Sequence, residues 1–161
     1  MIIAAYAGTG KTTLANMHPD KFTDFICMPY KYELSEDGDA GEGGKANPDN
    51  VMRPDWPYNY VDAIIENMGA GKHLLIPTDH LVLTHLQIKA IPYVLCYPQR
   101  DAKDVYRKRY INRGNSENFL DIFADHWDNW MAFFEEDTYG HHIVLRPDEF
   151  LCDIAERIEQ M

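Results

Sequence analysis

The start of the chain constrains the fold more than any other segment. Residues 1–6 form an apolar run that predicts a buried strand, and Gly8 and Gly10 follow it in a turn. Residues 11–17 lack glycine and proline, so they predict a helix that ends before Pro19. A strand, a glycine turn and a helix in this order are typical of the opening of a βαβ unit, in which the strands run parallel.

The same alternation continues along the chain. Further strands are predicted at residues 25–28, 73–76, 91–97 and 142–145, and further helices at residues 56–68, 79–89, 101–113, from Ser116 onward, and from Pro147 to Ile158. Alternating strands and helices predict an α/β protein whose parallel sheet is covered on both faces. The length of 161 residues fits one domain spanning residues 1–161.

Two segments stand apart from this pattern. Residues 33–54 are rich in Gly, Asp, Glu and Asn and predict a flexible insertion, either a mobile lid or a solvated loop without function. The helix after Ser116 carries apolar residues along one stripe, which predicts packing in the core. The members of that stripe are Phe119, Ile122, Phe123, Trp130 and Phe133.

Charge excludes one class of partner and indicates another. The formal net charge of −11 argues against nucleic acid as a partner, because binding a phosphate backbone needs a basic face. Residues 100–113 nevertheless carry six bases against two acids, which predicts a local anionic ligand there. No apolar run is long enough to span a membrane, and no signal peptide is apparent, so we expect no membrane partner and a cytoplasmic location.

The glycine turn carries the strongest functional signal. Gly8-Thr9-Gly10-Lys11-Thr12-Thr13 matches most of the pattern G-x-x-x-x-G-K-[ST], with Ala5 at the first glycine position. Backbone N–H groups of such a turn cradle phosphates, the lysine reaches the β- and γ-phosphates, and the Thr12 hydroxyl ligates Mg²⁺. We therefore predict binding of ATP with Mg²⁺; the alternative is a glycine-rich turn that binds nothing.

An acid that would complete a magnesium site is harder to place. Asp79 follows the strand predicted at residues 73–76 after a Pro-Thr pair, and Asp24 precedes the strand predicted at residues 25–28. Either carboxylate could lie near Mg²⁺, and Asp79 fits equally well as a helix N-cap.

Three segments resemble one family. Residues 8–12, residues 53–60 (Arg-Pro-Asp-Trp-Pro-Tyr-Asn-Tyr) and the strand and arginine-rich helix of residues 97–115 are similar to P-loop nucleoside and nucleotide kinases, of which adenylate kinase is the familiar member. Small kinase-like proteins of phage and prophage are the most similar group. The resemblance implies a three-layer α/β/α P-loop NTPase fold, a five-stranded parallel sheet in the order 2-3-1-4-5, and a lid at residues 100–115.

The resemblance also implies roles for the arginines. Arg109 and Arg113 lie four residues apart on one helix face and are expected to neutralise the transferred phosphoryl group, with Lys11 as their catalytic partner. Arg100, Lys103 and Arg107 lie on another face, and the sequence does not decide which face meets the nucleotide. The alternative for each is a solvated surface charge.

The acceptor site is the least specified. Residues 26–30, at the predicted end of the second strand, contain no acid that could deprotonate a hydroxyl, which favours an already ionised acceptor such as a nucleotide. Asp55 is the nearest alternative base. Trp56, Tyr58 and Tyr60 are candidates to stack an acceptor base, or else pack against the sheet.

Three functions follow as hypotheses. The first is a kinase that moves the γ-phosphoryl group of a nucleoside triphosphate to a nucleotide or similar small acceptor. The second is a nucleotide-binding regulatory or accessory protein with little turnover, favoured by Ala5 and by the absence of a clear magnesium acid. The third is a kinase for another small metabolite.

Overall fold

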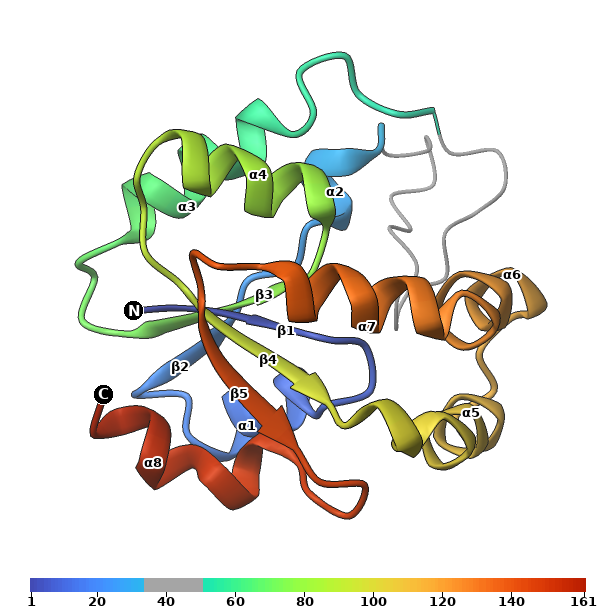
Figure 1. The fold of residues 1–161 in the computed structure, drawn as a ribbon. Helices are drawn as coiled ribbons and strands as arrows, with labels where there is room; N and C mark the ends of the chain where they lie inside the picture. Colours follow the sequence, from blue (N-terminus) through green and yellow to red (C-terminus); the bar gives the residue numbers. More distant parts are fainter. Residues whose placement is uncertain (34–50) are drawn as a thin grey trace.

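The computed structural model describes residues 1–33 and 51–161, and within these residues it is an α/β protein with a five-stranded, all-parallel sheet (Figure 1). The strands are β1 (Ile2–Ala5), β2 (Phe22–Asp24), β3 (His73–Pro77), β4 (Val94–Pro98) and β5 (His141–Leu145). Their order across the sheet is β2-β3-β1-β4-β5, which confirms the predicted parallel sheet and its strand order.

Helices cover both faces of the sheet. They are α1 (Lys11–Met17), α2 (Met28–Lys31), α3 (Tyr58–Asn67), α4 (His80–Ile88), α5 (Lys103–Asn112), α6 (Glu117–Leu120), α7 (Trp127–Glu136) and α8 (Ala155–Glu159), with short 3₁₀ helices η1 (Arg100–Ala102) and η3 (Leu151–Ile154) and the π-helix η2 (Asp121–Asp125). Helices α1 and α8 lie on one face, and α3, α4 and α7 lie on the other (Figure 1). None of the described helices is long and apolar enough to cross a membrane.

The central strand β1 faces two separate cores. Ile2, Ala4 and Tyr6 point into the core beneath α3, α4 and α7. Ile3 and Ala5 point into the core beneath α1 and α8. Successive side chains of a strand alternate between faces, so a strand covered on both sides is apolar throughout. This burial accounts for the continuous apolar run at the start of the chain.

The second strand is shifted from its predicted place. The sequence predicted residues 25–28, whereas β2 ends at Asp24 and Met28 begins a helix. Phe22 is buried and pairs with His73 of β3, while the ring of Phe25 leaves the strand to stack on Tyr60 with ring centroids 5.5 Å apart. Asp24 therefore stands at the carboxyl end of β2 and not at its start.

The helix predicted from Ser116 onward is interrupted. Ser116 caps α6 by accepting a hydrogen bond from the Phe119 N–H, but a π-helix separates α6 from α7. The Tyr6 hydroxyl donates to the carbonyl of Phe123 within the π-helix at 2.7 Å. A side chain that occupies a helix carbonyl in this way is a recognised cause of a broken helical ladder.

The start of the last helical segment also differs from the prediction, and the predicted insertion lies mostly outside the described residues. The last helical segment begins at Leu151 and not at Pro147, because the intervening residues form a turn in which Glu149 N–H donates to the Arg146 carbonyl. Most of the predicted insertion at residues 33–54 lies outside the described residues.

Candidate functional site

The β1–α1 loop, residues 6–10, requires glycine at two positions. Gly8 has a φ of 79° and Gly10 a φ of 96°, both in the left-handed region that side chains other than glycine rarely adopt. A Cβ added to Gly8 would lie 2.8 Å from the ring of Tyr110. The buried Thr9 hydroxyl donates to the Tyr6 carbonyl at 2.7 Å and closes the turn. The loop is therefore held in one compact shape.

Lys11 lies beneath this loop. Its Nζ donates to the carbonyl of Ala5 at 2.6 Å and to that of Tyr6 at 3.2 Å. Burial lowers the pKa of Lys11 to about 8, against the opposing attraction of the Asp24 carboxylate. Both hydrogen-bond partners of the ammonium group are neutral, so its positive charge is not cancelled by direct contact. A phosphate that entered the loop would meet this charge.

Thr12 and Asp24 form a pair that the sequence did not predict. The Thr12 hydroxyl donates to Asp24 Oδ2 at 2.5 Å, which links the start of α1 to the end of β2. A hydroxyl that ligates Mg²⁺ through a lone pair still carries its proton, and Asp24 is placed to accept that proton. The pair therefore fits a magnesium ion delivered with a nucleotide. The sequence indicated Asp24 as a candidate near Mg²⁺, but it placed this residue at the start of the second strand because the strand boundary was misplaced.

Asp79, the other predicted metal residue, has both carboxylate oxygens engaged. Oδ1 accepts from the Leu81 N–H at 3.0 Å, which caps α4, and Oδ2 pairs with Lys31 at 2.8 Å. The N-cap prediction for Asp79 is thus confirmed. Within residues 1–33 and 51–161, no group of three or more His, Cys, Asp or Glu side chains is arranged to hold a metal ion.

Helix α5 docks against the β1–α1 loop. The Tyr110 hydroxyl donates to the Ala7 carbonyl at 2.9 Å, and both Tyr106 and Tyr110 are fully buried next to Gly8. The predicted lid segment is therefore anchored in the core through its tyrosines. Whether residues 100–115 close over a ligand stays a prediction.

One face of α5 turns its arginines toward the loop. Arg109 and Arg113 line a cavity of about 520 Å³, whose other walls are Gly8, Gly10, Thr13, Met17, Asn112, Phe150, Cys152 and Asp153. The Arg109 guanidinium lies between the rings of Tyr106 and Phe150, at 4.4 and 4.0 Å from their centroids, and donates to the Pro147 carbonyl at 2.6 Å. Loop glycines and predicted catalytic arginines thus meet at one cavity.

Arg113 is also held by neutral groups. Its Nε and Nη2 donate to the side-chain oxygen of Asn115 at 3.1 and 2.9 Å. Its guanidinium lies 5.5 Å from the Tyr110 ring centroid, and burial lowers its pKa. Arg113 keeps its charge while facing the cavity. Phe150, which no sequence motif singled out, completes the cavity from the loop after β5.

The opposite face of α5 and η1 is neutralised. Arg100 pairs with Glu135 at 2.6 Å, Lys103 with Asp128 at 3.3 Å, and Arg107 with Asp125. All three acids belong to η2 or α7. The structure therefore separates the two faces that the sequence could not distinguish.

The four acceptor candidates do not form one site. Trp56 and Tyr60 are buried, stack on each other with ring centroids 5.7 Å apart, and belong to the core beneath α3 and α4. Of the two roles predicted for Trp56 and Tyr60, stacking on an acceptor base or packing against the sheet, the structure shows the packing. Tyr58 is exposed and meets the edge of His85, and Asp55 pairs with Arg53 at 3.1 Å. That hydrogen-bonded pair holds the pKa of Asp55 below its usual range.

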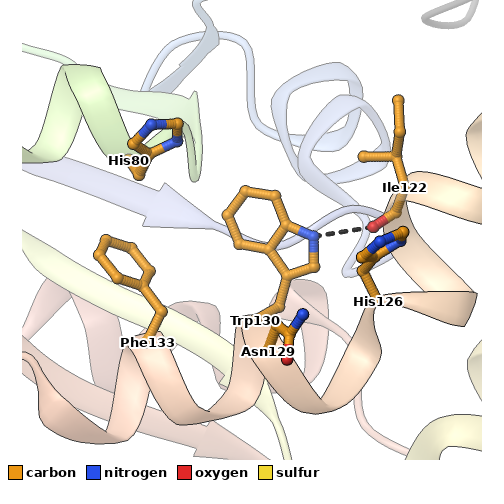
Figure 2. Close-up of a pocket in the computed structure, with 6 residues that line it drawn as sticks. All are labelled: His80, Ile122, His126, Asn129, Trp130 and Phe133. Atoms are coloured by element: carbon orange, nitrogen blue, oxygen red, sulfur yellow. Dashed lines mark hydrogen bonds between the residues drawn. The ribbon is translucent and has the colours of Figure 1, made fainter.

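A second cavity of about 450 Å³ lies between α4 and the η2–α7 segment (Figure 2). Its walls are His80, Ile122, His126, Asn129, Trp130 and Phe133. The sequence predicted Ile122, Trp130 and Phe133 to be core residues. Trp130 and Phe133 are only half-buried and Ile122 is exposed, so one edge of the aromatic stripe lines a hollow at the surface.

Comparisons with known proteins add no assignment. No protein-family model matches the chain, and neither the curated proteins nor the solved structures contain a significant match to it.

Proposed function

We propose that this protein binds a nucleoside triphosphate, as its magnesium complex, in the β1–α1 loop and transfers the γ-phosphoryl group to a small acceptor. The observation that carries the proposal is the 520 Å³ cavity, where the loop glycines face Arg109 and Arg113. Phosphoryl transfer needs positioning and neutralisation of charge more than a covalent catalyst. A fixed loop with three cations around it meets that need.

In the proposed reaction, an oxygen of the acceptor forms a bond to the γ-phosphorus as the bond to the β,γ-bridging oxygen breaks. The nucleoside diphosphate leaves with the electron pair of that bond. Lys11 lies beneath the loop and the two arginines lie across the cavity, so they stabilise negative charge on the phosphate oxygens. Magnesium, bound with the nucleotide, would be held through the Thr12 hydroxyl with Asp24 as its hydrogen-bond acceptor.

The class of acceptor is wider than the sequence indicated. A missing acid at the end of the second strand favoured an ionised acceptor, but β2 ends at Asp24. A hydroxyl acceptor, which must lose a proton, therefore belongs to the proposal together with a phosphate acceptor, which needs no base.

A nucleotide-binding protein with little turnover is the second candidate function. The engagement of both Asp79 oxygens favours it, because the acid that follows β3 is occupied by Lys31 and by the cap of α4. Binding without transfer would then be the function of the loop.

The first experiment is a thermal shift of the wild type and of Lys11→Ala with Mg-ATP. Ligand at a hundredfold excess over its Kd stabilises the folded state by about 2.7 kcal/mol, so the melting temperature rises. We expect the shift in the wild type and its loss in Lys11→Ala. No shift in the wild type at millimolar Mg-ATP would overturn the proposal.

The second experiment separates the two candidates. ADP release is measured with nucleosides, nucleoside monophosphates and small hydroxy acids as acceptors. Release that depends on one class of acceptor supports phosphoryl transfer and identifies that class. Binding of Mg-ATP without release for any of them favours the accessory protein, and release without an acceptor indicates simple hydrolysis.

A further inference from the structure

Tyr6 uses hydrogen-bonding groups at both of its ends. Its carbonyl accepts from the Thr9 hydroxyl at 2.7 Å and from Lys11 Nζ at 3.2 Å, so it organises the β1–α1 loop. Its hydroxyl, at the far end of a fully buried side chain, donates to the Phe123 carbonyl of η2 at 2.7 Å. Burial raises the pKa of this hydroxyl, so it stays protonated and remains a donor. One residue therefore joins the proposed phosphate site to the π-helix.

The Tyr6 ring is confined between these two ends. Its backbone N–H donates to the Cys96 carbonyl at 3.0 Å, which fixes the main chain beside β4. Four aromatic rings from η2 and α7 surround the side chain with centroids 5.4–6.0 Å away: Phe123, Trp127, Trp130 and Phe134. A close-packed interior transmits displacements, because its side chains have few voids to move into. A shift at either end of Tyr6 is therefore felt at the other.

The local sequence does not account for the π-helix η2. Residues 117–136 contain neither glycine nor proline, and the sequence predicts one helix there. Three consecutive carbonyls of η2 instead accept hydrogen bonds from side chains: Asp121 from the His126 ring at 2.7 Å, Ile122 from the Trp130 indole at 2.9 Å (Figure 2) and Phe123 from the Tyr6 hydroxyl at 2.7 Å. Such a conflict between local preference and observed structure means that tertiary contacts set the conformation.

Tyr6 is the donor among these three that lies outside residues 117–136, so η2 depends on the β1–α1 loop. A partly buried carbonyl that loses its donor costs free energy, and a segment with fewer hydrogen bonds opens more readily. Ile122, His126 and Trp130 also line the 450 Å³ cavity at the surface, so a change in η2 alters the walls of that cavity. Short π-helices are frequent at functional sites.

We propose that Tyr6 is a positioning residue that couples the β1–α1 loop to η2 through its hydrogen bond to Phe123. An anion in the loop draws the Lys11 ammonium from the Tyr6 carbonyl, because phosphate oxygens carry the charge that a carbonyl lacks. Tyr6 then shifts, and η2 loosens with it. The inference rests on the proposed function, since it names the element that responds when the phosphate site is filled.

Amide hydrogen exchange, followed by mass spectrometry on peptides from residues 117–130, measures the opening of η2. The variants are Tyr6→Phe, which removes only the hydroxyl, Lys11→Met, which removes a donor to the Tyr6 carbonyl, and the two combined. Tyr93→Phe is the matched control, because it removes another buried tyrosine hydroxyl, whose acceptor Asp137 lies at the far end of α7. Urea unfolding of each variant separates local opening from global unfolding.

We expect Tyr6→Phe to speed exchange in η2 about fivefold, because one hydrogen bond contributes that much to local stability. Lys11→Met should speed exchange in the wild-type background but add nothing to Tyr6→Phe, because both act through the same residue. Tyr93→Phe should leave η2 exchange unchanged. A non-hydrolysable Mg-ATP analogue should speed η2 exchange in the wild type, as Lys11→Met does, and leave the exchange of Tyr6→Phe unaffected.

Three results would overturn the inference. The first is η2 exchange that Tyr6→Phe changes no more than Tyr93→Phe does, and the second is effects of Tyr6→Phe and Lys11→Met that multiply in the combined variant. The third is an analogue that gives a thermal shift yet leaves η2 exchange at the unliganded rate.

Failure of the proposed function has a different signature. In that case the wild type shows no thermal shift with Mg-ATP, while the combined variant still exchanges at the rate of Tyr6→Phe. The loop and η2 would then be coupled in a protein that performs no phosphoryl transfer.

Discussion

The two faces of the basic segment at residues 100–113 both carry basic side chains, but the groups around those side chains differ in charge. On the face toward η2 and α7, Arg100, Lys103 and Arg107 are each matched by a carboxylate. On the face toward the β1–α1 loop, the partners of Arg109 and Arg113 among residues 1–33 and 51–161 are a carbonyl, an amide and aromatic rings.

This difference separates a structural charge from a functional one. A cation next to a carboxylate is neutralised, so it attaches one element to another and attracts no further anion. A cation held by neutral groups keeps its full charge, and placing it at a cavity costs solvation free energy that an anionic ligand restores. Lys11 belongs with the second kind, because its partners are also carbonyls.

The largest expected effect tests this division directly. Arg109→Ala combined with Arg113→Ala should lower the kcat/KM of phosphoryl transfer by about a hundredfold or more, because each removes a cation from the charged transition state. The matched control is Arg100→Ala combined with Arg107→Ala, which removes two charges from the paired face of the same segment. Equal losses of kcat/KM in the two double variants would contradict the distinction between the two faces.

The docking of α5 on the loop is tested at the two glycines. Gly8→Ala should destabilise the fold by about 1–3 kcal/mol, because its methyl group meets the Tyr110 ring in a backbone conformation that alanine disfavours. Gly10→Ala shares the backbone strain, but its new Cβ would lie 3.5 Å from Phe150, an ordinary contact. Urea unfolding of both variants should rank Gly8→Ala as the less stable. The reverse order would mean that α5 does not press on the loop.

The pH dependence of Mg-ATP binding tests whether Lys11, like Arg109 and Arg113, carries a charge that acts on a bound anion. Its pKa of about 8 means that the free protein loses this charge above pH 8, and a bound phosphate restores the proton. Affinity for Mg-ATP should therefore fall by up to about tenfold per pH unit above about pH 8 and be flat below about pH 7. Calorimetric titrations at pH values from below about pH 7 to well above about pH 8 measure this slope, and Lys11→Arg should abolish it if that variant still binds.

The same lowered pKa has the opposite effect on the unliganded protein. Between the folded pKa of about 8 and the ordinary value of 10.5, the unfolded chain binds more protons at this position, so the contribution of Lys11 to stability rises with pH. Stability of the wild type minus that of Lys11→Met, compared at about pH 7.5 and about pH 9.5, isolates this contribution. A difference that falls with pH would contradict the burial of Lys11.

The smallest effect belongs to the paired face. Arg107→Ala alone should change the free energy of unfolding by less than about 1 kcal/mol, because exposed ion pairs contribute little. Thermal unfolding of this variant gives the value. A loss well above that limit would mean that the paired face supports the fold more strongly than exposed ion pairs do.

What could be predicted from the sequence was local or came through the family resemblance. The strand, glycine turn and helix at residues 1–17 need only neighbouring residues to specify them, and the structure has all three, with the strand one residue shorter at each end. The end of β2 depends on the pairing of Asp24 with Leu75, far along the chain, so Asp24 was misplaced. Burial of Trp56 and Tyr60 likewise depends on distant partners.

The candidate site was predictable only in part for the same reason. Spacing put Arg109 and Arg113 on one helix face, but the acids that neutralise the other face come from η2 and α7. The 450 Å³ cavity brings His80 of α4 next to Trp130 of α7, which lie in separate elements and share no sequence signal. Periodicity therefore predicted the helix that carries Trp130 and missed the hollow that Trp130 lines.

The setting of Arg109 has a consequence for the entropy of ligand binding. A flexible side chain that becomes ordered when a ligand binds costs about 0.5–1.5 kcal/mol of affinity. The Arg109 guanidinium is already confined between the rings of Tyr106 and Phe150 and tied to the Pro147 carbonyl. Its rotamer freedom is lost when the chain folds, so an anion that enters the cavity meets an arginine with little disorder left to lose.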